Sequence, residues 1–215
     1  MGLRIGLIGD LHGSTLNARN WMLRTRPDFC LQVGDYWSYD EEWPVPVYWI
    51  FGNHERGEAV RGLINGTYPS PENNRWLMGG ISDIMGVSVM ALPGLPQSRG
   101  GPGPAKYPPR VYQLCQKQAG KHVDIFISHG CGFKFGTMAR DLNTGRTEFF
   151  NFEESDITDL IKIVQPTYAV SGHNHMYAVE EHEEIRCIRL GHRPSELTHM
   201  IEVEPRTAGE MEDEA

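Results

Sequence analysis

The sequence predicts an α/β fold, because apolar, β-rich runs alternate with helical stretches along most of its 215 residues. The first run, "LRIGLIG" (3–9), is continuously apolar, which is typical of a strand buried on both faces of a parallel sheet. Polar residues follow several of the runs at once, at the place where open α/β sheets bind their ligands. Hydrophobic residues make up 40% and charged residues 22% of the chain, an ordinary globular balance.

Strands and helices alternate through the first half of the chain. A helix is expected where Ser14 and Thr15 offer a start and apolar residues follow. A hairpin is expected where two β-prone runs flank a glycine, with its turn at Met85-Gly86. The expected elements are a helix over 14–25, strands over 29–34 and 45–52, a short helix over 57–65 and the hairpin over 81–94.

The second half opens with a segment rich in proline and glycine, "PGLPQSRGGPGPAKYPPR" (93–110), which excludes regular structure. A structureless loop of this length inside a compact domain is usually functional or mobile. Residues 131–152 are compatible with more than one structure. The remaining elements are a helix over 110–119, a strand over 123–128, a helix over 154–165 with Ser155 as candidate N-cap, and strands over 167–172, 185–190 and 199–204.

Nothing in the sequence marks a boundary between domains. We therefore expect a single domain over 1–205 and a disordered acidic tail over 206–215.

Asp10 comes too early for the apolar core of a signal peptide, and no apolar stretch is long enough to cross a membrane. The four cysteines are far apart in the chain, which predicts reduced thiols and a cytoplasmic location.

Charge is distributed unevenly along the chain. The net charge of −8 argues against sequence-independent binding to nucleic acid. No acid lies between Asp83 and Asp124, whereas the chain from Glu180 onward has eleven acids and four arginines. The basic residues of the middle segment are Arg99, Lys106, Arg110, Lys117 and Lys121. This pattern is compatible with a solvated surface, or with an anionic ligand beside the middle segment.

Potential metal ligands follow five of the expected strands. They are Asp10 and His12 after strand 3–9, Asp35 after 29–34, Asn53 and His54 after 45–52, His129 after 123–128, and His173 and His175 after 167–172. The carboxyl ends of such strands converge on one crevice. Oxygen and nitrogen donors without a thiolate suit Mn²⁺, Fe, Co, Ni or Zn²⁺ better than calcium. Two ions about 3.5–4 Å apart could use most of these groups, with one carboxylate as a bridge.

Each of these residues alone has an ordinary explanation. A single histidine is more often structural than metal-binding, and "GD" and "GNH" are common turn sequences. The ordered set is what predicts a metal site. Two divalent cations would leave a pocket of about +2 after Asp10 and Asp35 are counted, because histidines bind metals in their neutral form. Such a pocket attracts a phosphate, and a metal-bridging water would be acidic enough to attack it near neutral pH.

The motifs D-x-H (10–12), GD (34–35), GNHE (52–55), His129 and GHxH (172–175), in this order, resemble those of the calcineurin-like metallophosphoesterases. The resemblance covers about residues 3–176. It implies a four-layer α-β-β-α sandwich in which two mixed β-sheets pack face to face. It also implies two divalent metal ions, Mn²⁺ first, with Fe, Zn, Co, Ni or Mg as alternatives.

The same resemblance implies a role for each matching residue. Asp10, His12 and His175 would bind the first metal, Asp35 would bridge, and Asn53, His129 and His173 would bind the second metal. His54 is not a ligand in the family. It would lie over the substrate phosphate and stabilise or protonate the leaving oxygen, a task that suits a side chain titrating near neutral pH.

Two departures narrow the activity that the resemblance implies. Protein phosphatases of this superfamily carry GDxVDRG, whereas "GDYWSYD" has Ser38 and Tyr39 at the positions of the second Asp and the Arg. A protein phosphatase is therefore not expected, although Asp40 or Glu55 could replace the missing partner of the catalytic histidine.

A weaker likeness is to the RNA lariat debranching enzymes, through "VYWIFGNHE", "GGIS" after "RWLMG", "DIFISHG" and "PTYAVSGHNH". Those enzymes typically have Cys where this chain has Asp10, and they carry more sequence after the core. This likeness favours phosphodiester substrates.

Several residues near the motifs could contact such a substrate. Arg56 follows GNHE directly, and Arg99, Lys106 and Arg110 could hold a phosphate or polyphosphate from the 93–110 loop, or be solvated charges. Tyr36 and Trp37 follow the bridging aspartate, and they could stack on a base or pack in the core.

The sequence thus predicts a dinuclear metal-dependent phosphoesterase that acts through a metal-bridging hydroxide. It favours phosphodiesters of nucleotide or nucleic-acid type, with phosphomonoesters as the alternative and no membrane partner. A catalytically silent metal-binding scaffold on the same fold is an alternative of another class. A scaffold would be expected to lack some of the site residues, but all seven ligand positions and His54 are filled.

Overall fold

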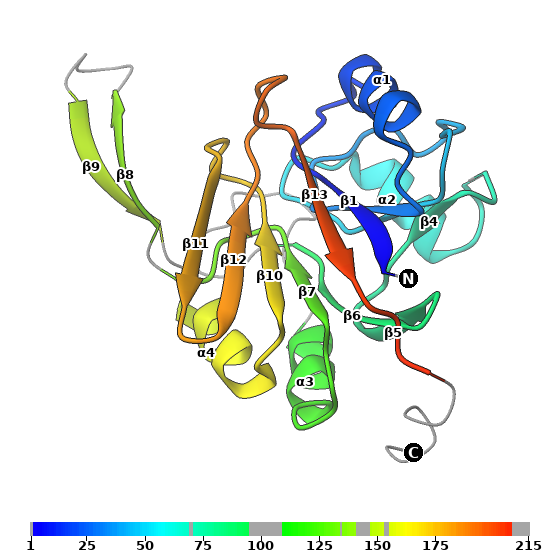
Figure 1. Cartoon of the computed structure of the whole chain (residues 1–215). Coiled ribbons are helices and arrows are strands. Elements are labelled where there is room, and N and C mark those ends of the chain that lie inside the picture. The colour runs from blue at the N-terminus through cyan, green and yellow to red at the C-terminus, as the bar shows by residue number, and fades with distance from the viewer. Residues whose placement is uncertain are drawn as a thin grey trace.

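The structure is a computed structural model, and it describes residues 2–68, 71–94, 109–133, 135–140, 147–152 and 155–207. The described strands form a five-stranded sheet, a six-stranded sheet and a two-stranded ribbon. Figure 1 shows the two sheets side by side and the ribbon projecting beyond them. Arg99 and Lys106, which the sequence suggests as phosphate contacts, lie outside the described residues, as does the tail from residue 208 onward.

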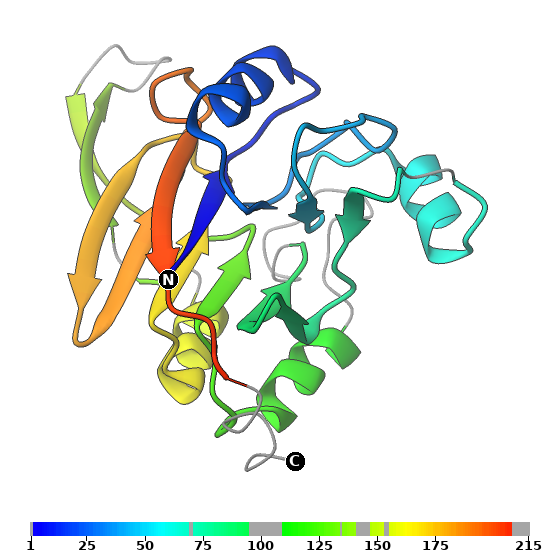
Figure 2. The ribbon, with the colours of Figure 1, turned by 45° about the vertical axis from the view of Figure 1, so that its right-hand side comes forward.

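The five-stranded sheet has the order β13-β1-β2-β3-β4. Its four parallel strands are β1 (Leu3–Ile8), β2 (Phe29–Gln32), β3 (Val47–Trp49) and β4 (Asn74–Trp76). At one edge, β13 (Thr198–Val203) pairs antiparallel with β1, and Figure 2 shows these two strands together. Helices α1 (Leu16–Thr25) and α2 (Gly57–Ile64) belong to this half of the molecule.

The six-stranded sheet has the order β11-β12-β10-β7-β6-β5. Its four central strands are parallel: β12 (Ile185–Arg189), β10 (Tyr168–Ser171), β7 (Ile125–Ser128) and β6 (Val87–Leu92). Antiparallel strands β11 (Ala178–His182) and β5 (Gly80–Ile84) form its edges. Helices α3 (Pro109–Lys117) and α4 (Ser155–Val164) cover this sheet, and β8 (Phe135–Arg140) pairs with β9 (Thr147–Phe152) in the separate ribbon.

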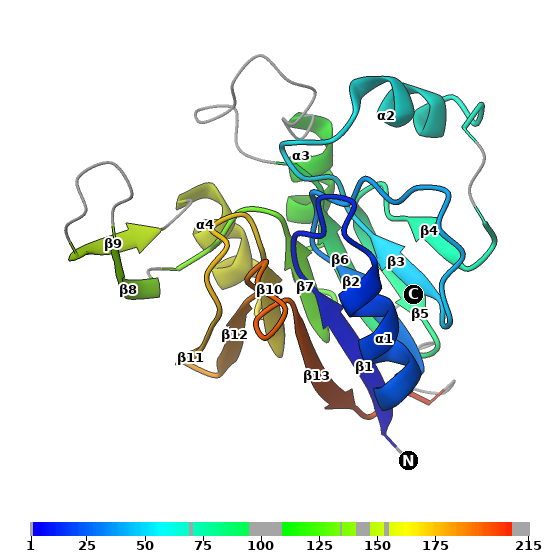
Figure 3. The ribbon, with the colours of Figure 1, turned by 90° about the horizontal axis from the view of Figure 1, so that it is seen from above.

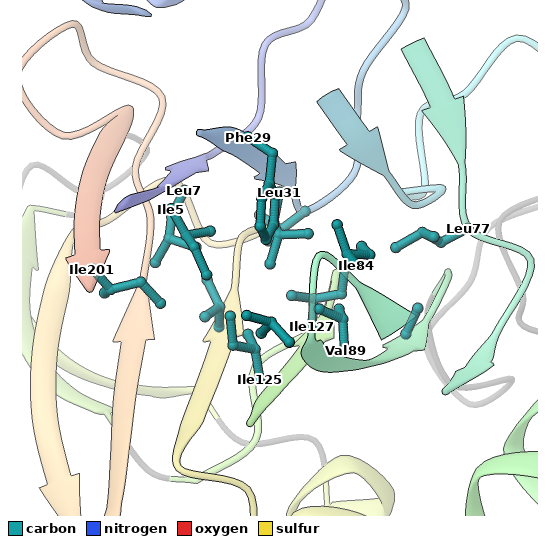
Figure 4. Close-up of a cluster of buried hydrophobic side chains, with 14 of the residues drawn as sticks. Ile5, Leu7, Phe29, Leu31, Leu77, Ile84, Val89, Ile125, Ile127 and Ile201 are labelled. Carbon is teal, nitrogen blue, oxygen red and sulfur yellow. The ribbon is translucent and has the colours of Figure 1, made fainter. Parts of the chain in front are cut away.

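Apolar side chains fill the space between the two sheets. Ile5 and Leu31 of the first sheet belong to the same buried cluster as Val89, Ile125 and Ile127 of the second, and Figure 4 shows them facing each other. Burying one such side chain contributes about 1.5–3 kcal/mol. This cluster is the central core of the molecule.

Two further clusters attach the helices to the outer faces of the sheets. One includes Met22 of α1 and Trp49 of β3, and the other includes Leu160 of α4 and Phe126 of β7. The order of layers is therefore helices, sheet, sheet, helices, as Figure 3 shows from above. The expected four-layer α-β-β-α sandwich with two mixed sheets is confirmed.

Most of the expected elements are present, and the differences lie at sheet edges and helix ends. The hairpin turns at Met85 and Gly86, whose φ angles of 58° and 84° are those of a primed turn. Strands β4 and β11 were not expected from the sequence, and β8 and β9 fall in the segment left ambiguous. Ser155 is the first residue of α4 rather than its N-cap.

Among the residues that the structure describes, no helix is both long enough and apolar enough to span a membrane. The four cysteines are all buried and form no disulfide, as the sequence predicted.

Candidate metal centre

Backbone hydrogen bonds join the loops that carry the candidate ligands. The N–H of His12 donates to the carbonyl of Asp35 at 2.8 Å, and the N–H of Gly172 donates to the carbonyl of His129 at 3.1 Å. Each bond ties the loop after one parallel strand to the loop after the neighbouring strand. Side chains from separate strand ends are therefore held together at one edge of the sandwich.

Asp10, His12 and His175 form the first group of side chains at this edge. Nε2 of His12 lies 3.1 Å from Nε2 of His175, which in turn lies 3.3 Å from Oδ2 of Asp10. Ligand atoms of these three residues and of Asp35 all lie within 4.8 Å of one another. These are the three residues that the family resemblance assigns to the first metal.

Asn53, His129 and His173 form the second group. Oδ1 of Asn53 lies 2.8 Å from Nε2 of His129 and 2.9 Å from Nδ1 of His173. The family resemblance assigns these three residues to the second metal.

Asp35 stands between the two groups. Its Oδ2 lies 3.7 Å from Nε2 of His12 and 3.5 Å from Nε2 of His129. Its Oδ1 accepts a hydrogen bond from the backbone N–H of His54 at 2.8 Å. One carboxylate thus faces a histidine of each group, which is the position that a bridging ligand would need.

The donor set fits cations for a simple electrostatic reason. Nδ1–H of His129 donates to the carbonyl of Val33 at 2.8 Å, so that a neutral His129 has only a lone pair at Nε2. That lone pair faces the oxygens of Asn53 and Asp35. Among the described residues, Oδ2 of Asp35 accepts no hydrogen bond although it is buried. A cation would satisfy these converging lone pairs, which otherwise repel one another.

Burial favours the neutral form of three histidines of the site. Burial lowers the pKa of His12 and of His129. Burial, followed by the neighbouring His192 and His12, lowers the pKa of His175 to about 4. Neutral imidazoles have the lone pairs that metal binding requires.

The two aspartates destabilise each other in the absence of a cation. Burial and then the charge of Asp35 raise the pKa of Asp10 well above its usual range. Both carboxylates are buried, with exposed fractions of 1% and 0%, so bulk water screens their repulsion poorly.

Glycines before the ligands make room for neighbouring ligands. A Cβ at Gly172 would collide with the Asp10 carboxylate, and a Cβ at Gly52 would collide with Asp35. Gly34 has a φ angle of 106°, and a Cβ there would lie 2.5 Å from Nδ1 of His129. The Gly-Asp, Gly-Asn and Gly-His pairs of the sequence therefore have a steric cause.

Several site residues adopt the left-handed backbone conformation that is rare outside glycine. Their φ angles are 46° at His12, 52° at Asp35, 56° at Trp37, 66° at His173 and 56° at His175. Each such residue costs about 1–3 kcal/mol, and such residues cluster at functional sites.

The rim of the site carries three further residues that the sequence singled out. His54 is exposed, and its ring centre lies 5.9 Å from that of His12. Arg56 is also exposed, and its guanidinium lies over the ring of half-buried Trp37, 5.9 Å from the ring centre. All three are thus placed where they could meet a bound substrate.

Tyr36 packs in the core, which is the second of the two roles that the sequence left open for it. It is fully buried, its hydroxyl donates to Oδ1 of Asn74 at 2.8 Å, and its ring stacks on Trp49 at 4.8 Å. Base stacking by Tyr36 is therefore excluded.

Glu55 supports the loops instead of pairing with the His54 ring. Its Oε1 accepts hydrogen bonds from the backbone N–H groups of Tyr36 at 2.9 Å and Gly52 at 3.1 Å, and its Oε2 accepts one from the Tyr39 hydroxyl. Asp40 is exposed and, within the described part of the chain, makes no hydrogen bond with His54. The structure gives no support to either as a replacement for the missing aspartate.

Arg110 is the remaining phosphate contact that the sequence suggested, and the structure does not connect it to the site. Arg110 is exposed in the first turn of α3 and makes no hydrogen bond or ion pair with the clustered side chains among the described residues.

Two residues near the site were not predicted from the sequence. His192 follows β12, and its ring centre lies 4.5 Å from that of His175. Buried Gln32 donates to the carbonyls of Gly9 and Gly34 and so joins the ends of β1 and β2. The rule that polar residues gather after parallel strands could have found His192, whereas nothing in the sequence marks Gln32.

The model of the calcineurin-like phosphoesterase family matches residues 3–177. The chain belongs to this family of calcineurin-like phosphoesterases. The match extends from β1 to the last histidine of the site, so it includes every residue of both groups.

Relatives with similar sequences include lariat debranching enzymes. The chain is 26% identical to a lariat debranching enzyme of Drosophila melanogaster, over 81% of this chain and 38% of that protein. It is also 26% identical to the human lariat debranching enzyme, over 66% of this chain and 30% of that protein. The chain thus spans less than two fifths of the length of these relatives.

A solved structure has the same fold at lower sequence similarity. The TT1561 protein of Thermus thermophilus superposes with a TM-score of 0.60 at 13% identity, covering 95% of this chain and 100% of that one. At this identity the similarity concerns the fold alone.

Proposed function

We propose that this protein is a phosphodiesterase that acts on nucleotide or nucleic-acid substrates with two divalent cations. The observation that carries the proposal is the arrangement of Asp35 between two groups of ligands, with a buried oxygen that accepts no hydrogen bond among the described residues. Asp10, His12 and His175 would hold one cation, and Asn53, His129 and His173 the other. When bound, the cations would polarise the phosphate and lower the pKa of a nearby water.

In this proposal His54 acts on the leaving oxygen. Its backbone N–H is fixed by Asp35 at 2.8 Å, while its side chain is exposed beside His12. The imidazole can therefore reach a phosphate bound at the cluster and donate a proton to the departing alkoxide.

Two observations support a diester over a monoester. The named relatives are lariat debranching enzymes. Tyr39 stands where the phosphate-clamping arginine of protein phosphatases would fall, and its hydroxyl is used by Glu55. A monoester, with its additional negative charge, would thus lack one cationic contact.

The first experiment compares His54→Ala with wild type on two diesters in the presence of Mn²⁺. Replacing His54 should lower kcat about 100-fold on a dinucleotide, whose alkoxide leaving group needs a proton. The loss should be smaller on bis-p-nitrophenyl phosphate, because p-nitrophenolate leaves without one. The wild type should also hydrolyse this diester more efficiently than p-nitrophenyl phosphate.

His122→Ala is the matched control, since His122 lies in the turn before β7 and pairs with Asp124. It should retain wild-type rates on both diesters. Equal losses of kcat on both substrates in His54→Ala would contradict the proton-donating role. Elemental analysis should find about two manganese ions per chain in the wild type and fewer in Asp35→Ala.

A further inference from the structure

Trp37 has a backbone conformation that its side chain does not favour. Its φ angle is 56°, which costs about 1–3 kcal/mol for a residue other than glycine. It lies two residues after Asp35 and is half-buried, unlike its buried neighbours Tyr36 and Tyr39. This backbone conformation places the Trp37 ring at the rim of the candidate metal centre, whereas the rings of Tyr36 and Tyr39 lie in the core.

Contacts from the loops after β1 and β3 hold this ring in place. Nε1–H of Trp37 donates to the backbone carbonyl of His54. The ring meets that of His12 edge to face, with centres 5.3 Å apart and an interplanar angle of 82°. Gly13 lies beside it, since a Cβ at Gly13 would be 3.8 Å from Trp37 Cβ and Cε3. The indole is therefore fixed with respect to a candidate metal ligand.

Arg56 completes the arrangement. Its guanidinium carbon lies over the indole, 5.9 Å from the ring centre. Two groups in direct stacking contact are about 3.5–4 Å apart, so the guanidinium is not closely stacked. A flat ring that stacks on two partners needs about 7 Å between them. The exposed Arg56 side chain can move outward to widen its distance from the indole to this value.

We propose that Trp37 and Arg56 form a nucleobase subsite next to the phosphate that is cleaved. This inference rests on the proposed function, because it names which part of a nucleotide substrate the rim recognises. An indole face and a guanidinium plane are the two kinds of protein group on which bases stack. The Trp37 ring contacts His12, which is itself a candidate metal ligand, so a base on the indole and its phosphate at the cluster would belong to one nucleotide.

Calorimetric binding of adenosine 5′-monophosphate and ribose 5-phosphate to the Mn²⁺-loaded protein tests the subsite. The two probes share the sugar and the phosphate and differ only in the base. Stacking of one base on an aromatic side chain is worth about 1–3 kcal/mol, so the wild type should bind the nucleotide at least about fivefold more tightly. Trp37→Leu should bind both probes equally, with the affinity for ribose 5-phosphate unchanged, and Arg56→Gln should lose part of the difference.

The matched control is Trp21→Leu, which replaces a half-buried tryptophan of α1 that packs against Gly6. It should keep the wild-type ratio, and Trp37→Phe should keep much of it because a smaller aromatic face remains. Equal binding of the two probes by the wild type, or an unchanged ratio in Trp37→Leu, would overturn the subsite. Hydrolysis of bis-p-nitrophenyl phosphate, measured in parallel, separates this outcome from a failure of the proposed function.

Discussion

At the scale of single residues, Glu55 connects the loops after β2 and β3 through three hydrogen bonds. Glu55→Ala would leave the buried N–H groups of Tyr36 and Gly52 without an acceptor. Each unsatisfied group costs about 1–3 kcal/mol. We therefore expect the free energy of unfolding, measured by urea denaturation of the metal-free protein, to fall by roughly 2–6 kcal/mol.

Tyr39→Phe provides the graded comparison, because it removes one of the three hydrogen bonds of Glu55, together with the acceptor of the Arg56 N–H, and leaves the two backbone bonds to Glu55 intact. It should cost about 1 kcal/mol. Equal stability of Glu55→Ala and wild type would show that Glu55 does not support these loops.

The candidate ligands could be predicted from the sequence because each lies within four residues after the end of a strand. Asp10, Asp35 and His129 need only a parallel sheet to be brought together. The hydrogen bonds of Glu55 could not be predicted in this way, and for Tyr36 and Trp37 the sequence left open which ring would face the site and which would pack in the core. They depend on which direction a side chain takes from a strained loop, and several distant backbone groups decide that direction.

At the scale of elements, the loop after β10 is shaped by the space that Gly172 leaves for Asp10. In Gly172→Ala the new Cβ would collide with the Asp10 carboxylate and lie 2.9 Å from Cγ2 of Val33. Overpacking of this kind costs about 1–3 kcal/mol. We expect a lower melting temperature and a manganese content below that of the wild type by elemental analysis.

Gly66→Ala is the control for Gly172→Ala, because it changes the stability of the protein without bringing a new atom against a metal ligand. Gly66 has a φ angle of 68°, and a Cβ there would meet nothing within 4 Å. This variant should lose some stability through strain but retain full manganese content. Full retention of manganese by Gly172→Ala would contradict the steric argument.

Long apolar runs such as β1 and β10 could be recognised in the sequence, whereas the edge strands β4 and β11 could not. β4 contains only three residues, and β11 reads "AVEEH", with no buried face along it. Among the strands that the structure describes, each pairs with one neighbour alone. Pairing at an edge depends on the strand already in place more than on the side chains of the edge strand.

At the scale of the whole molecule, the site lies where two sheets meet, and each sheet supplies part of it. β1, β2 and β3 carry Asp10, Asp35 and Asn53, whereas β7 and β10 carry His129 and His173. The apolar core between the sheets therefore fixes the distance between the two halves of the ligand set. This coupling implies that cation binding and global stability depend on each other.

Thermal unfolding in EDTA and in Mn²⁺ measures that dependence. At a free Mn²⁺ concentration about 100-fold above the dissociation constant, binding should add about 2.7 kcal/mol, or roughly 5–10 °C in Tm for a chain of this size. Asp35→Asn should lose most of this shift. In EDTA it should melt no lower than the wild type, because it removes a buried charge next to Asp10. A wild-type Tm that is the same in EDTA and in Mn²⁺ would show that this cluster of carboxylates and imidazoles does not bind the cation.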